Sequence, residues 1–205
     1  MEPISKEAAN DILEPYLARI KKCILDAVNG YYTGSDYLKV RHKHSPRTSA
    51  SLCHDHITDS IQFEFENEPG VRVSKKRGIF TLTVKGIVVL RFKKFNNKLL
   101  SSGISTKQMQ AFNLQDAFQL EMDNLVPNGL LHVGYVLNAL GTGVKDVYIT
   151  YRYGNINIWN IPLSEIDVVQ PELFPASVAS STTRRRNVKA KGITASAGDE
   201  NAINS

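Results

Sequence analysis

Histidines, a cysteine and two aspartates gather in one short stretch, and side chains of these types can bind metal ions. The group comprises His42, His44, Cys53, His54, Asp55, His56 and Asp59. Imidazole, thiolate and carboxylate groups are the usual protein ligands of zinc. His54 and His56, however, are two positions apart in a stretch with a helical pattern, and such residues do not face each other on a helix.

Asp55 and Asp59 are four positions apart, so on a helix they share a face that can hold a divalent cation. The candidate metal ligands are therefore His54, Asp55, His56 and Asp59, which would serve a metal-dependent hydrolase using the segment from His42 to Asp59. We expect instead that these side chains are solvated or hydrogen-bonded, and we assign no cofactor.

The second candidate is a long stretch without carboxylates. Between Pro69 and Gln115 the chain has no Asp or Glu but has ten basic residues: Arg72, Lys75, Lys76, Arg77, Lys85, Arg91, Lys93, Lys94, Lys98 and Lys107. Such a segment cannot balance its own charge and presents a positive field to solvent. It also lacks the acids of a restriction-type nuclease core, so no catalytic residue is assigned and a non-catalytic role is expected.

Part of this basic stretch has the alternation of a β-strand. Alternation along residues 87–95 puts Arg91, Lys93 and Phe95 on one face, and Phe92 and Lys94 on the other. Cations neutralise phosphates and an exposed aromatic ring can stack on a base. The alternative interpretation is that the lysines protect strand edges from aggregation. The predicted nucleic-acid-binding residues are Arg41, Arg47, Arg72, Lys75, Lys76, Arg77, Arg91, Lys93, Lys94 and Phe95.

The net charge of +5 and the isoelectric point near 9.1 favour an acidic partner. The leading hypothesis is a nucleic-acid-associated accessory protein that binds the phosphate backbone of DNA or RNA, with little sequence specificity, through a basic sheet surface. The alternative is a protein-interaction module, such as an inhibitor or antitoxin-like partner, whose basic face docks on an acidic protein.

The periodicity of the chain predicts an α+β domain over residues 1–175. Helical patterns cover residues 5–65, with one helix from Ser5 to Val28 that stops at Asn29-Gly30 and another from Thr48 or Ser49 to Phe63. A mainly antiparallel sheet follows over residues 70–165, built from a three-stranded meander, a short helix within residues 106–121 and C-terminal hairpins. Residues 176–205 are rich in Ser, Ala, Thr and Gly and are predicted to be a disordered basic tail.

Two tight turns set the expected strand registers. A turn at Lys85-Gly86 would pair Leu82 with Val89, and a turn at Gly154-Asn155 would place Trp159 opposite Thr150.

The location of the protein follows from what the N-terminus and the cysteines lack. The first residues show no signal-peptide pattern, no apolar run reaches the ~18 residues of a membrane span, and two cysteines make no disulfide framework. We therefore expect a cytoplasmic protein that does not associate with membranes.

Overall fold

The α+β architecture is confirmed by the computed structural model, which describes residues 3–76, 78–101, 103, 106–116 and 128–166. Helices come first along the chain and a mainly antiparallel sheet follows. Arg77 and the predicted tail at 176–205 lie outside the described residues.

The described strands form one six-stranded sheet in chain order. The strands are β1 (Val71–Lys76), β2 (Ile79–Val84), β3 (Val88–Lys94), β4 (Gly129–Leu137), β5 (Val144–Tyr153) and β6 (Ile156–Pro162). All neighbours are antiparallel except β3 and β4, which run parallel. A parallel pair needs a crossover connection, and the segment between these two strands includes helix α4 (Lys107–Asn113).

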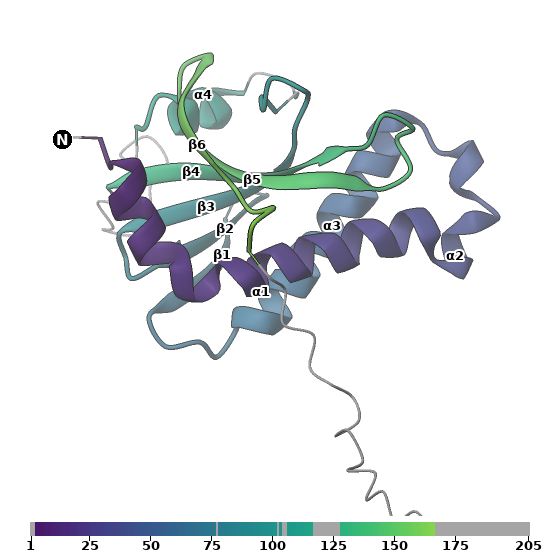
Figure 1. Ribbon diagram of the computed structural model, residues 1–205, viewed down its shortest axis with the longest axis horizontal. Helices are drawn as coiled ribbons and strands as arrows, with labels where there is room; N and C mark the ends of the chain where they lie inside the picture. The colour runs from purple at the N-terminus through teal and green to yellow at the C-terminus, as the bar shows by residue number, and fades with distance from the viewer. Residues whose placement is uncertain (1–2, 77, 102, 104–105, 117–127, 167–205) are drawn as a thin grey trace, which may run out of the picture. The chain divides into compact units, whose positions relative to one another are not determined.

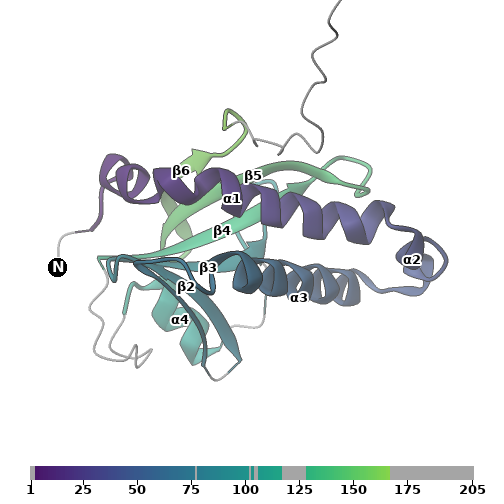
Figure 2. The same ribbon diagram turned by 90° about the horizontal axis from the view of Figure 1, so that it is seen from below.

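Two long helices cover one face of this sheet. Helix α1 (Lys6–Thr33) contacts β4, β5 and β6, whereas helix α3 (Pro46–Phe65) contacts β1 and β3. The short helix α2 (Ser35–Leu38) and the 3-10 turn η1 (Arg41–Lys43) connect them. Figure 1 shows α1 and α3 on one side of the sheet and α4 on the other, and Figure 2 shows α1 and α3 side by side.

Both long helices begin at serine caps. A serine hydroxyl at this position accepts a hydrogen bond from a first-turn amide that would otherwise lack a partner within the helix. The Ser5 hydroxyl accepts from the amide of Ala8, and the Ser45 hydroxyl accepts from the amide of Thr48. The second helix therefore starts one turn earlier than Thr48, with Pro46 in its first turn, where its missing N–H is harmless.

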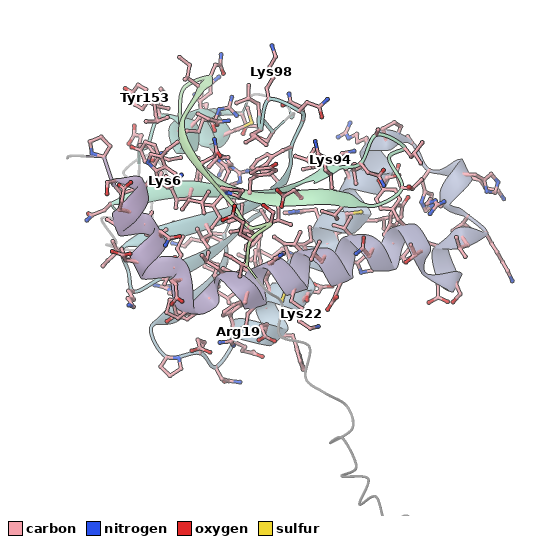
Figure 3. All side chains as sticks on the ribbon, in the orientation of Figure 1. Lys6, Arg19, Lys22, Lys94, Lys98 and Tyr153 are labelled. Atoms are coloured by element: carbon pink, nitrogen blue, oxygen red, sulfur yellow. The ribbon has the colours of Figure 1, made fainter. Side chains whose placement is uncertain are left out.

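An ion-pair network joins the two helices to each other. Arg19 of α1, labelled in Figure 3, binds the carboxylates of Glu64 and Glu68 at 2.6 Å each and stacks over the ring of Phe65. Below this network the apolar faces of both helices and of the sheet form one buried cluster, which includes Leu17 and Phe92.

The registers of both hairpins differ from the predicted ones by one residue. Leu82 pairs with Leu90 instead of Val89, because three residues, not two, separate Val84 from its partner Val88. Alternate apolar residues of β2 and β3 therefore meet on the helix-covered face. The side chains of Val89, Arg91 and Lys93 lie on the opposite face of β3.

A register shift between Tyr151 and Arg152 moves the second hairpin in the same way. Trp159 lies opposite Tyr151, not Thr150, and its ring stacks on Tyr151 with 5.4 Å between ring centroids. The indole N–H of Trp159 donates a hydrogen bond to the backbone carbonyl of Ile4. This bond holds the segment before α1 against strand β6.

Helix α1 also runs past its predicted stop at Asn29-Gly30 and ends at Thr33. The helical spacing of buried residues continues from Val28 to Tyr31, and burial of that ring extends the helix by one turn. The chain then turns at Gly34, where a Cβ atom would overlap the carbonyl oxygen of Gly30.

These two glycines provide a matched test of this end of the helix. We expect Gly34→Ala to lower the free energy of unfolding by about 1–3 kcal/mol, because the added methyl group meets backbone. In Gly30→Ala the added Cβ atom has no other atom within 4 Å. This variant should raise the free energy of unfolding by about 0.5–1 kcal/mol, since alanine favours the helix more than glycine does. Urea denaturation of both variants measures the difference, and equal effects would contradict the close approach at Gly34.

Candidate cationic site on the second sheet face

The sheet face opposite α1 and α3 gathers four basic side chains from three adjacent strands. Strand pairing puts Arg91 of β3 beside His132 of β4, and His132 beside Thr150 of β5. Lys93 follows Arg91 by two positions and Arg152 follows Thr150 by two, so both share this face. We call Arg91, Lys93, His132 and Arg152 the cationic cluster.

Aromatic rings flank the cationic cluster on two sides. Phe112 of α4 packs on Val89 and Leu130, 4.8 Å from the His132 ring centroid and 5.5 Å from the Arg91 guanidinium carbon. Cation–π attraction favours that position of the guanidinium.

On the other side Phe95 lies where a side chain at position 134 would be, because a Cβ atom on Gly134 would clash with its ring. Gly134 therefore makes room for Phe95.

Hydrogen bonds from Gln115 fix the end of α4 to this face. Its amide nitrogen donates to the carbonyls of Leu130 at 2.9 Å and Arg152 at 2.8 Å, and its carbonyl accepts from the amide of Leu130. Gln115 adopts a positive φ of 60°, which is uncommon outside glycine and asparagine. These three bonds hold it there and position Phe112 over the cluster.

Several buried polar atoms of the cluster have no hydrogen-bond partner among the described residues. The Nε of Arg152 donates to the carbonyl of Gly154 and its Nη2 donates to the side chain of Asn155, but its Nη1 has no partner in the described part of the chain. The same holds for the Nη1 of Arg91 and for both ring nitrogens of His132, which are also buried. His132 is 1% exposed and Arg152 is 6% exposed. Buried donors without partners are rare in native proteins.

The electrostatics of the cluster follow from this burial. Burial, and then the charges of Arg91, Arg152 and Lys93, lowers the pKa of His132 to about 3, so its ring is neutral at pH 7. Burial and then Arg91 lower the pKa of Lys93 to about 8, and burial lowers the pKa of both arginines. No carboxylate of the described residues forms a salt bridge with Arg91, Lys93 or Arg152. The cluster therefore holds positive charge that the described part of the chain does not neutralise.

The predicted nucleic-acid-binding residues do not form one surface. Arg91 and Lys93 belong to the cluster, and Arg72 and Lys76 of β1 share their face by strand pairing. Lys75 and Lys94 alternate onto the helix-covered face; Figure 3 labels Lys94.

The other predicted residues have different surroundings. Arg41 of η1 donates to the Tyr32 carbonyl and lies over its ring, and Arg47 is exposed at the start of α3. The Phe95 side chain is only 4% exposed, so it offers no ring for base stacking in this conformation.

The histidine-rich segment packs against tyrosines. His44 is hydrogen-bonded with the hydroxyl of Tyr31 at 2.9 Å, and His56 with the hydroxyl of Tyr37 at 2.6 Å. Over the described ranges, no three His, Cys, Asp or Glu side chains converge to hold a metal ion. These histidines therefore help to join α2 and η1 to the long helices.

His132 and Arg152 were not among the residues predicted from the sequence. Both lie in largely apolar strands, and alternation places each away from the helix-covered core. The available signal was a basic residue within an apolar stretch of each strand. Only the parallel pairing of β3 with β4 shows that these positions lie beside Arg91.

Comparison of the chain with protein-family models, curated proteins and solved structures gives no match. None of the helices in the described ranges is long and apolar enough to cross a membrane.

Replacing one cation of the cluster tests whether its charge is uncompensated. We expect Arg91→Met to raise the free energy of unfolding by about 1 kcal/mol or more, because it removes a buried charge and retains an apolar side chain. Arg19→Met is the control, since it breaks two ion pairs and should lower stability by about 1 kcal/mol. Urea denaturation reports both values, and a loss in Arg91→Met as large as in Arg19→Met would contradict the interpretation.

Proposed function

We propose that this protein binds nucleic acid as an accessory factor, through contacts between phosphates and the second face of its sheet. One observation carries the proposal. The six strands contain eight Lys or Arg and a single carboxylate, Asp146, and five of the cations share the face that α1 and α3 do not cover. These five are Arg72, Lys76, Arg91, Lys93 and Arg152.

Phosphate contacts explain this composition better than edge protection does. Protective lysines belong on exposed sheet edges, whereas Arg91 and Lys93 lie on β3, an interior strand, and are partly buried. A cation that gives up part of its hydration there needs an anionic partner to offset the loss. Nucleic acid supplies such anions at regular spacing, and contacts to phosphate carry little sequence information.

A loop extends the positive surface from β3 to the far edge of the sheet. The side-chain amide of Asn157 in β6 donates to the carbonyls of Lys98 and Leu99, so the loop after β3 crosses to β6. Figure 3 shows Lys98 and Tyr153 at the same margin of the molecule. This loop carries the exposed Lys98 side chain, and its partner Asn157 lies opposite Arg152 in the β5–β6 pair.

The test compares two double variants with identical net charge. We expect Arg91→Gln with Lys93→Gln to weaken binding to all DNA or RNA sequences alike. It should lower the slope of log affinity against log salt by about 2, because each lost phosphate contact removes about one unit. Lys75→Gln with Lys94→Gln, which alters the helix-covered face, should change the slope much less. Fluorescence anisotropy across a salt series measures both.

Equal losses in the two double variants would show that net charge alone drives binding and would overturn the proposed surface. Recovery of one stoichiometric acidic protein from cells, with no oligonucleotide binding at low salt, would favour the protein-interaction alternative.

A further inference from the structure

The cationic cluster differs from an ordinary phosphate-contacting surface because it contains buried nitrogen atoms that have no hydrogen-bond partner among the described residues. These atoms are the Nη1 atoms of Arg91 and Arg152, which are donors, and the two ring nitrogens of His132, one of which is a donor in the neutral ring. A strand of nucleic acid that passes over a surface meets exposed side chains, as Arg72 and Lys76 are here. Donors with almost no exposed area need a ligand group that enters between the side chains.

The buried donors belong to one site. Arg91 and His132 are direct partners across the β3–β4 pair, and Arg152 of β5 comes directly after Tyr151, the partner of Leu131. The charges of Arg91, Arg152 and Lys93 all act on the His132 ring. The three charged side chains therefore lie around the His132 ring of β4.

The chemistry of these groups specifies the ligand. Two guanidinium groups and an ammonium group carry three formal positive charges, and the pKa of Lys93, at about 8, leaves its amine mostly protonated at pH 7. Guanidinium donors form strong charge-assisted bonds to phosphate oxygens. A phosphomonoester has three terminal oxygens and a charge of about −1.5 to −2 at pH 7. A phosphodiester within a strand has one negative charge and two ester bonds that must leave in opposite directions.

We infer that the cationic cluster binds a phosphomonoester dianion. The inference rests on the proposed function for the origin of this phosphate: we take it to be the terminal phosphate of a nucleic-acid strand. Arg91 and Lys93 are partly exposed, so the cluster reaches solvent along β3, where the strand can leave.

The neutral imidazole of His132 acts as a donor in this arrangement. With a pKa of about 3 it carries one ring N–H at neutral pH, and that N–H can bond a phosphate oxygen without adding a fourth charge.

The experiment compares one short oligonucleotide in three forms: without a terminal phosphate, with a 5′-phosphate and with a 3′-phosphate. We expect one phosphorylated form to bind the wild-type protein about tenfold more tightly than the unphosphorylated form. The gain should shrink between about pH 7.5 and about pH 5.5, as the phosphate dianion takes up one proton near its second pKa of about 6 and becomes a monoanion. Arg91→Met should abolish the gain, and Lys94→Met, on the same strand but the opposite face, should retain it.

Inorganic phosphate separates the two claims. Equal, salt-dependent binding of all three forms, with no thermal stabilisation of the protein by inorganic phosphate, would overturn the inference and leave the proposed function intact. Stabilisation of the wild type by phosphate that is absent in Arg91→Met, with no oligonucleotide bound, would support a phosphomonoester site for a free ligand and overturn the proposed function.

Discussion

The parallel pairing of β3 with β4 is the constraint on which the candidate site depends. It is the one parallel pair among the described strands, and it sets Arg91 beside His132. A parallel pair also requires the chain to cross the sheet, and α4 lies in that connection. The same pairing therefore brings the cations together and supplies Phe112, the ring that packs against two of them.

The two faces of the sheet differ in composition and in their expected roles. The face under α1 and α3 is apolar and buries the largest side chains, which supplies most of the driving force for folding. The described part of the second face has a small apolar cluster of Val89, Phe112 and Leu130 beside buried guanidinium and imidazole groups. Replacing such groups with apolar ones is often stabilising, so stability does not explain their presence. The proposed anionic ligand would neutralise them and would give them a role.

Periodicity was enough to predict the two long helices and the meander. Apolar residues at helical spacing predicted the helices from Ser5 to Val28 and from Thr48 or Ser49 to Phe63, and alternation predicted the three strands of the meander. Strand registers were not predictable in the same way. One more residue in a turn, as at Lys85–Ile87, or a bulge within a strand, as between Tyr151 and Arg152, shifts every partner beyond it by one position.

The candidate site was only half predictable for the same reason. Arg91 and Lys93 follow from local alternation and lie within the carboxylate-free window. His132 and Arg152 come from strands about forty and sixty residues further along the chain, and their proximity depends on tertiary pairing. Alternation separated the face that holds Arg91 from the face that holds Lys94, but it could not show which of the two faces the helices cover.

Photo-crosslinking of bound nucleic acid, followed by mass spectrometry of the crosslinked peptides, tests most directly which face makes contact. If the second face binds nucleic acid, crosslinks should fall on the loop at 96–101, which carries Lys98, and on the β5–β6 turn beside Tyr153. Crosslinks concentrated on the exposed sides of α1 and α3 would contradict this account.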